Sequence, residues 1–351
     1  MKVFHCDHCG QLLFFENVNC VRCGRALAFV PELHELTSLD PVGDNQWRSP
    51  LAAMALRLCE NYPKYNVCNW ALSASDPNPL CRSCRLTRTI PNLSKPGNDR
   101  RWYNLEVGKR RLLYTLDQLG LPLKNRIEDP AGLVFDFLDD PEPGTGLPPV
   151  LTGHAEGVIT VNVAEADEAE RVKRRQQLNE TYRTLLGHFR HEIGHYYWDR
   201  LIRGTPRIDG FRERFGDERA DYNAALHAHY QGAPVPLNWQ DSYVSAYATM
   251  HPWEDWAETW AHYLHMTDTL ETSAACGISL RPRRHDEPTL QQVPDPTEGP
   301  SFDRMMDGWG AITYVLNNLN RGLGSGDAYP FVLSTPSIEK LRFVHETCLS
   351  L

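Results

Sequence analysis

The sequence predicts an α+β protein in which a small cysteine-rich module precedes a mostly helical C-terminal half. Two C-x-x-C pairs stand within residues 1–30, and four further cysteines follow at 59–84. A β-branched segment at 157–163 predicts a strand. Apolar residues recur at helical spacing across 182–197, which predicts an amphipathic or buried helix soon after that strand.

Length and charge narrow the class of protein. The 351 residues can form two domains with a sizeable core, and the net charge is −9. Nucleic acid is therefore not expected as the main partner, because such binders normally carry a basic balance. The basic runs 109–111 and 173–175 have acidic neighbours and predict solvated helix faces. No stretch is apolar enough for a membrane span or a signal core, so we expect a cytoplasmic protein with no membrane partner.

The first cysteine group has the spacing of a zinc ribbon. Its thiols are Cys6, Cys9, Cys20 and Cys23, and a glycine follows the second cysteine of each pair. Each pair lets two thiolates bind one ion, and the glycine permits the tight turn. We expect residues 1–30 to hold a structural Zn²⁺ rather than a redox or disulfide pair.

A second cysteine group consists of Cys59, Cys68, Cys81 and Cys84. One C-x-x-C pair within this group matches a second structural zinc site with four thiolates, and the alternative is a set of buried free thiols or a partial site. A turn-rich stretch then separates a metal-stabilised module, 1–97, from a main domain, 98–351. Zinc ribbons have many roles, and recruitment of a partner protein is one of them.

Residues 191–195 read His-Glu-Ile-Gly-His. On a helix His191 and His195 lie one turn apart on one face, which suits two ligands of a single Zn²⁺. Glu192 lies beside them, where it can reach a water on the metal. A catalytic zinc of this kind takes three protein ligands and a water, so one further ligand is needed.

Two carboxylate clusters, 217–221 and 254–258, compete for the third position. Tryptophan and tyrosine neighbours would bury the second cluster, whereas arginines around the first predict an ion-pair network. We expect Glu254 to bind the metal and Glu258, one turn later, to accept the free N–H of a ligand histidine. Glu258 itself and the pair Asp217 and Asp221 stay open as alternatives.

His-Glu-x-x-His with a later Glu-x-x-Ala-Glu resembles the gluzincin branch of zinc metallopeptidases. The segment 245–258 is similar to lethal-factor-like peptidase domains, which implies that Tyr247, seven residues before Glu254, stabilises the oxyanion. The cysteine-rich module together with 191–198 and 251–265 resembles the bacterial zinc-binding metallopeptidases with an N-terminal zinc ribbon. That resemblance covers nearly the whole chain and implies a zincin-like fold.

The motifs together with the resemblance predict a zinc-dependent peptidase with one catalytic and two structural zinc ions, acting on a protein or peptide. Glu192 would move the proton, Tyr247 would donate to the oxyanion, and Glu258 would orient His191. The strand at 157–163 could offer its edge to an extended substrate. Two alternatives stay open: a zinc-ribbon adaptor protein with an inactive zincin core, and a zinc hydrolase of a non-peptide amide.

Overall fold

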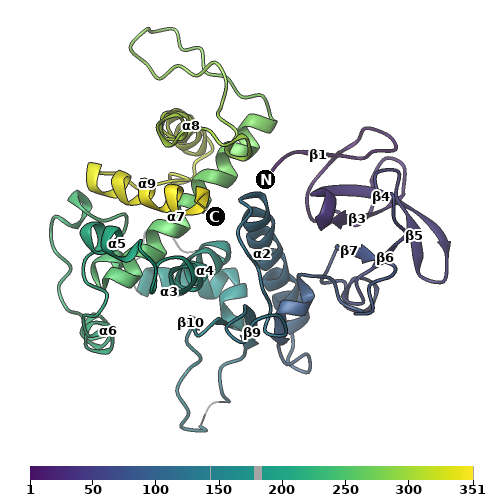
Figure 1. Ribbon diagram of the computed structural model, residues 1–351, viewed down its shortest axis with the longest axis horizontal. Coiled ribbons are helices and arrows are strands. Elements are labelled where there is room, and N and C mark those ends of the chain that lie inside the picture. The colour runs from purple at the N-terminus through teal and green to yellow at the C-terminus, as the bar shows by residue number, and fades with distance from the viewer. Residues whose placement is uncertain (143, 178–183, 351) are drawn as a thin grey trace.

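The computed structural model describes residues 1–142, 144–177 and 184–350, and over these residues it has the α+β architecture that the sequence predicts (Figure 1). The strands are β1 (Phe4–His5), β2 (Leu12–Leu13), β3 (Ala26–Val30), β4 (Glu35–Gly43), β5 (Gln46–Arg48), β6 (Leu56–Leu58), β7 (Ala71–Ser73), β8 (Thr87–Thr89), β9 (Val134–Leu138), β10 (Gly153–Ala155) and β11 (Val158–Asn162). The helices are α1 (Asn61–Tyr65), α2 (Asn98–Gln118), α3 (Glu168–Gln177), α4 (Leu185–Leu201), α5 (Ile208–Phe215), α6 (Tyr222–Tyr230), α7 (Pro252–Ala275), α8 (Phe302–Gly322) and α9 (Thr335–Leu349). In this part of the chain, none of the helices has the length and apolar character needed to cross a bilayer.

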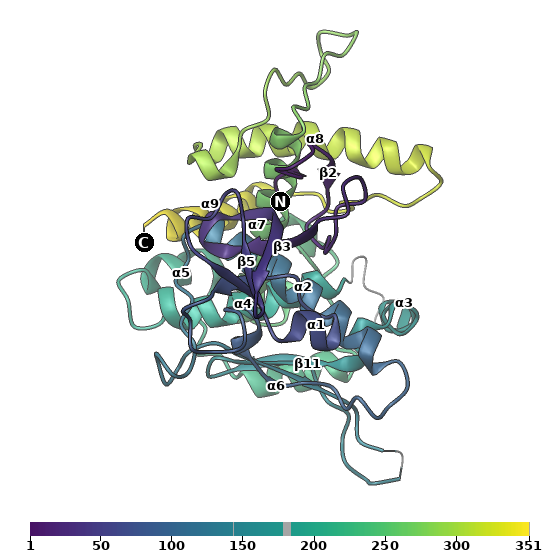
Figure 2. The same cartoon turned by 90° about the vertical axis from the view of Figure 1, so that its right-hand side faces the viewer.

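The N-terminal strands form two antiparallel sheets. β1 pairs with β2 in a small hairpin, and β3 to β7 form a five-stranded sheet in chain order. Leu27 and Phe29 of β3 are fully buried. Both ribbon views place these strands against one side of α2 (Figures 1 and 2).

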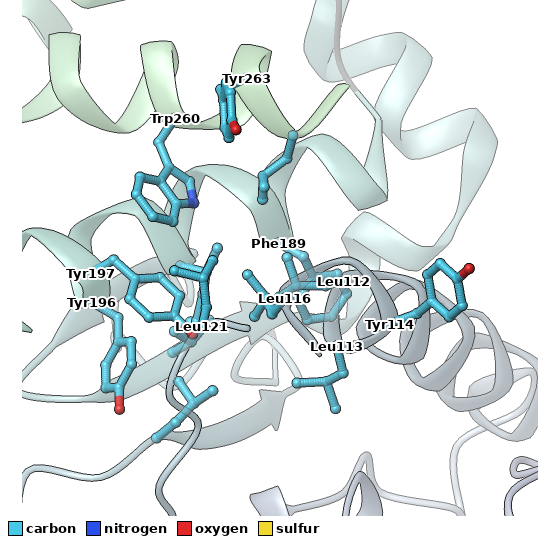
Figure 3. Packing of buried hydrophobic residues seen from close by; sticks show 14 of the residues in the cluster. Leu112, Leu113, Tyr114, Leu116, Leu121, Phe189, Tyr196, Tyr197, Trp260 and Tyr263 are labelled. Atoms are coloured by element: carbon cyan, nitrogen blue, oxygen red, sulfur yellow. The ribbon is translucent and has the colours of Figure 1, made fainter. Parts of the chain in front are cut away.

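One continuous hydrophobic core joins the N-terminal strands to the helices. Figure 3 shows Leu112 and Leu116 of α2 beside Phe189 of α4. On another side of α2, the ring of Tyr114 meets Phe15 of the ribbon edge-on, with 5.6 Å between the ring centroids. This core includes residues on both sides of the expected boundary at residues 97 and 98, and β8 before the boundary pairs with β9 after it. The division into two domains therefore stays a prediction.

The sheet of the main domain has the order β10-β11-β9-β8. β8, β9 and β11 run parallel, and β10 pairs antiparallel with β11 at the edge. The expectation that 157–163 offers a sheet edge is wrong, since β11 is hydrogen-bonded on both sides. The edge strands are β8 and β10, and β10 is a three-residue segment too short to show a strand pattern in the sequence.

The basic run 109–111 is not a solvated face, so that prediction is wrong. Lys109 and Arg110 are buried, and the Lys109 ammonium lies 2.8 Å from a carboxylate oxygen of Glu106, which is also buried. Arg111 is partly exposed and pairs with Glu16. In the second run, Lys173 is exposed, whereas the side chains of residues 174 and 175 lie outside the described residues.

Helices α4 and α7 cross in close contact at Gly194. A Cβ atom on Gly194 would stand 3.0 Å from Cα of Ala257 and 3.1 Å from Cβ of Trp260. Nε1 of Trp256 donates a hydrogen bond to the Gly194 carbonyl oxygen at 2.9 Å. A side chain at 194 would push the helices apart, so the glycine within the pentapeptide fixes how near α7 comes to the two histidines.

Candidate active site

Three groups of side chains in the described parts of the chain could each hold a metal ion, and each group keeps its ligand atoms within 4.8 Å of one another. The first consists of Cys6, Cys9, Cys20 and Cys23, the second of Cys59, Cys68, Cys81 and Cys84, and the third of His191, His195 and Glu254. The first two sets are those that the cysteine spacing predicts, and the third joins the two histidines of the motif to Glu254, the expected third ligand. The structure brings every expected ligand together with its partners.

The ribbon cysteines lie on two tight turns. The amide N–H groups of Gly10 and Gly24 donate to the carbonyl oxygens of Cys6 and Cys20, and both glycines have positive φ. The sulfur atoms are 3.8 Å apart for Cys6 and Cys23. A zinc–sulfur bond of about 2.3 Å implies about 3.8 Å between sulfurs in a tetrahedral site, so the four thiols fit one zinc ion.

The second cysteine group is buried in the core. Sγ of Cys68 and Sγ of Cys81 are 3.7 Å apart, and the amide of Cys81 donates to Sγ of Cys59 at 3.3 Å. Burial raises the pKa of the Cys81 thiol well above its usual range. A cation among the four sulfurs would stabilise the thiolate form, and the buried guanidinium of Arg110 adds positive charge nearby.

The third group lies where α4 and α7 cross. Nε2 of His191 is 3.2 Å from Nε2 of His195 and 2.9 Å from Oε2 of Glu254. Nε2 of His195 is 3.5 Å from Oε1 of Glu254. Zinc bonds of about 2.0–2.2 Å imply ligand atoms about 3.3–3.6 Å apart. The three separations, 2.9–3.5 Å, lie in or slightly below this range, so a small widening lets two imidazoles and one carboxylate hold one ion that keeps a further position open.

The electrostatics at this point favour a cation. His191 lies between two carboxylates, because its Nδ1 is 2.7 Å from Oε1 of Glu258. Burial opposes a charge on His191, yet Glu254 and Glu258 outweigh it and raise the pKa of the imidazole well above its usual range. Burial likewise opposes a charge on Glu254, but the two histidines hold the pKa of that carboxyl well below its usual range.

The two expected proton-handling groups flank the ligands. Glu192 is 7% exposed, and burial raises the pKa of its carboxyl. The ring of Tyr247 lies 5.8 Å from the His191 ring, in a short 3₁₀ turn before α7. Burial, followed by the charge of Glu254, raises the pKa of Tyr247 well above its usual range, so this phenol stays a hydrogen-bond donor.

The rival carboxylates of 217–221 are engaged elsewhere. Asp217 is an exposed partner of Arg219, at 2.7 Å, and Glu218 pairs with Arg212. Asp221 is the N-cap of α6, where its side chain accepts from the amide of Ala224. These contacts agree with the ion-pair network expected from the arginines nearby.

Aromatic residues surround the ligands, and sequence reasoning missed two of them, Tyr222 and His154. The hydroxyl of Tyr222 donates to Oε1 of Glu254 at 2.9 Å, and Trp253 packs on His195 with 4.2 Å between ring centroids. His154 of β10 stacks near His195 at 6.2 Å. His251 caps α7 and contacts the carbonyl of Ala220. Trp253 and His251 carry a local signal, since both stand within three residues of Glu254 in the chain.

Comparison with known proteins agrees with this arrangement. A family model described as "Putative zinc-binding metallo-peptidase" matches residues 98–347, and a zinc-ribbon domain model matches residues 3–95. The chain belongs to this metallopeptidase family. Membership confirms the family resemblance predicted from the sequence, and with it a zinc ribbon ahead of a mostly helical domain.

Two mycobacterial relatives have nearly the same extent as this member of the family. The "Uncharacterized protein Rv2568c" of Mycobacterium tuberculosis is 43% identical over 348 residues, which cover 98% of this chain and 94% of the relative. The "Uncharacterized protein Mb2598c" of Mycobacterium bovis has the same identity and coverage. No solved structure matches the chain.

Proposed function

We propose that this protein is a zinc-dependent metallopeptidase that hydrolyses peptide bonds of a protein or peptide substrate. The observation that carries the proposal is the convergence of His191, His195 and Glu254 from two crossing helices, with the buried Glu192 beside them. Three protein ligands that leave a position open are typical of catalytic zinc, whereas the four-thiolate groups are typical of structural zinc. One catalytic and two structural ions per chain follow from these three sets.

Bound by this triad, Zn²⁺ would polarise the substrate carbonyl and lower the pKa of a water ligand. Glu192 accepts the proton of the attacking water and delivers it to the leaving amine, a role supported by its buried carboxyl and raised pKa. Tyr247 donates its phenolic hydrogen to the oxyanion. Glu258 accepts a hydrogen bond from Nδ1–H of His191, which directs Nε2 of that histidine toward the metal.

The substrate reaches the site along the sheet edge. β10 is the edge strand on the side of the metal ligands, since His154 within it stacks near His195. An extended peptide can therefore pair with β10 as an added strand and pass beside the histidines. Peptide is preferred to a small amide on this ground, because backbone pairing needs a chain of several residues.

The ribbon is the part of the chain that we assign to partner recruitment. It exposes three apolar side chains, Leu12, Phe14 and Val21, at 50%, 71% and 85% of their surface. Two sets of four unpaired thiols suit a reducing compartment, and we therefore propose a cytoplasmic location. The adaptor alternative, with an inactive core, is disfavoured because every side chain that the mechanism needs is present at the site.

The proposal is tested by comparing newly formed protein N-termini in cells that carry the wild type, Glu192→Gln or Glu213→Gln. Glu213 is an exposed acid that pairs with Arg214, so its variant is the matched control. We expect wild type and Glu213→Gln to generate the same set of cleavage sites, and Glu192→Gln to generate none of them. The Glu192→Gln protein should keep all its zinc. Cleavage by the Glu192→Gln protein at the wild-type rate would overturn the mechanism.

A further inference from the structure

Helix α6 lies over the metal site but has little packing of its own. It contains no buried residue, and it is held to the site by individual contacts. Just before it, Nε2 of His251 donates to the carbonyl oxygen of Ala220 at 3.1 Å. At its far end, the ring of His229 meets Tyr247 edge-on at 5.3 Å. Between these two contacts, Tyr222 reaches a proposed metal ligand.

The hydroxyl of Tyr222 donates to Oε1 of Glu254 at 2.9 Å, and the carboxylate is 1% exposed. Two aromatic side chains fix the direction of the phenol. Tyr222 meets His251 at 5.3 Å and 83°, and Trp253 at 5.6 Å and 78°, both edge-on. The hydrogen bond is therefore part of a packed arrangement of rings from the start of α7.

The two oxygens of Glu254 are placed differently. Oε2 is 2.9 Å from Nε2 of His191, within the ligand set, while Oε1 is 3.5 Å from Nε2 of His195 and accepts from Tyr222. A carboxylate this close to both imidazoles could bind a metal through either oxygen or through both. A hydrogen bond withdraws electron density from the oxygen that accepts it, which makes Oε1 the weaker ligand.

We propose that Tyr222 is a positioning residue of the metal site, whose hydroxyl holds Oε1 of Glu254 so that the carboxylate presents Oε2 alone to the metal. The inference rests on the proposed function in one respect, the assignment of Glu254 as a ligand. Single-oxygen binding keeps the number of protein donor atoms at three and leaves room for water and for the substrate carbonyl. Binding through both oxygens would fill part of that room.

The test uses Co²⁺ in the third site of the full chain, with zinc retained in both cysteine sites. A chelator removes the ion held by the histidines, Co²⁺ replaces it, and elemental analysis checks for one cobalt and two zinc ions. The proteins compared are the wild type, Tyr222→Phe and Tyr314→Phe. Tyr314 is an exposed tyrosine of α8 and serves as the control.

Four-coordinate Co²⁺ absorbs visible light more strongly than five-coordinate Co²⁺. We expect wild type and Tyr314→Phe to give the same strong bands, and Tyr222→Phe to give weaker bands at equal cobalt content. Peptide turnover of the zinc-loaded Tyr222→Phe protein should fall about 10–100-fold, mainly through kcat. Identical spectra for wild type and Tyr222→Phe would overturn the role of Tyr222.

The outcomes separate this inference from the proposed function. If the spectrum changes in Tyr222→Phe but the zinc-loaded wild type cleaves no peptide, the positioning role is supported and the peptidase proposal is wrong. A wild type that takes up no third metal removes both. Circular dichroism of the three proteins should coincide, which excludes a folding defect as the source of the spectral change.

Discussion

The cysteine sites and the histidine site of this protein are built in opposite ways. The ribbon ligands lie on two local turns, and each C-x-x-C pair is set by a few hydrogen bonds within its own segment. The proposed ligands His191, His195 and Glu254 come from two helices that meet only in the folded state. Four thiolates close a site, whereas two imidazoles and a carboxylate leave it open.

The contrast separates stability from chemistry. We expect loss of a thiolate to lower the stability of the fold, because a metal held by four thiolates would tie the N-terminal segments to the core that they share with the helices. Loss of a group beside the open site leaves a packed helix pair in place, and its effect falls on reaction rate. Substitutions at the two kinds of site and in the core around them should therefore differ in the size of their free-energy effect.

The largest effect is expected from Cys81→Ser. This thiol is fully buried in the second cysteine group, so the variant should bind one zinc ion fewer and lose several kcal/mol of unfolding free energy. Elemental analysis and urea unfolding measure both quantities. Cys276→Ser, at an exposed and isolated cysteine, is the control and should match the wild type. Normal stability after loss of the second-site zinc would show that this site is not structural.

Tyr247→Phe should act on rate alone. Removal of one oxyanion donor typically lowers kcat by about 10²–10³-fold, or about 3–4 kcal/mol. Steady-state kinetics on a cleaved peptide measures the change, and zinc content and unfolding temperature should equal those of the wild type. Tyr314→Phe provides the comparison. A wild-type kcat in Tyr247→Phe would leave this tyrosine as a packing residue only.

Acid should weaken the helical half through His262. Burial lowers the pKa of this histidine to about 4, and Nδ1 lies 2.6 Å from the hydroxyl of Tyr329. An unfolded histidine has a pKa of about 6.5, so the unfolded state binds more protons between these two values, and stability falls as pH drops through that window. The full shift corresponds to about 3 kcal/mol.

The check is urea unfolding at pH 7.5 and 5.0 for wild type, His262→Gln and His285→Gln, with zinc content followed at each pH. His285 is exposed in a loop after α7. The loss of stability on acidification should be smaller in His262→Gln than in the other two proteins. Equal losses in all three would assign the acid sensitivity to other groups.

Gly194→Ala tests the helix crossing that creates the open site. A Cβ at 194 would stand 3.0 Å from the α7 backbone, and overpacking of this kind costs about 1–3 kcal/mol. The variant should also hold its third metal more weakly while the cysteine sites stay filled, as measured by competition with a chelator. Gly310→Ala in α8, where a Cβ meets nothing within 4 Å, should be neutral or stabilising. If Gly194→Ala bound its third metal as tightly as the wild type, the close crossing of α4 and α7 would not be what places the ligands.

The sequence predicts the local sites well because their ligands are set by spacing. Cysteine pairs and the i, i+4 histidines lie within single turns or one helix, so the pattern names the residues directly. Glu254 and Glu258 could be predicted because they lie one helical turn apart and because the neighbouring aromatic residues indicate that this carboxylate cluster is buried. The α+β class followed from the strand and helix patterns around these motifs.

Features that depend on distant contacts could not be predicted. Tyr222 reaches Glu254 from a separate helix, with no spacing rule to connect them. Lys109 can be buried because its ammonium pairs with Glu106 on the same helix and donates a hydrogen bond to Thr87 on β8. Only the folded sheet brings Thr87 to this position. The edge position of β10 likewise depends on its pairing with β11, since its own three residues form no pattern.

The central claim is that the chain holds three metal ions, two in closed cysteine sites and one in an open histidine site. Crystals of the zinc-loaded protein, measured on both sides of the zinc absorption edge, test this claim most directly. The account predicts three anomalous peaks, one in each group of four sulfurs and one among the two imidazoles of His191 and His195 and the carboxylate of Glu254. Peaks at the cysteine groups alone, with none at the helix crossing, would contradict it.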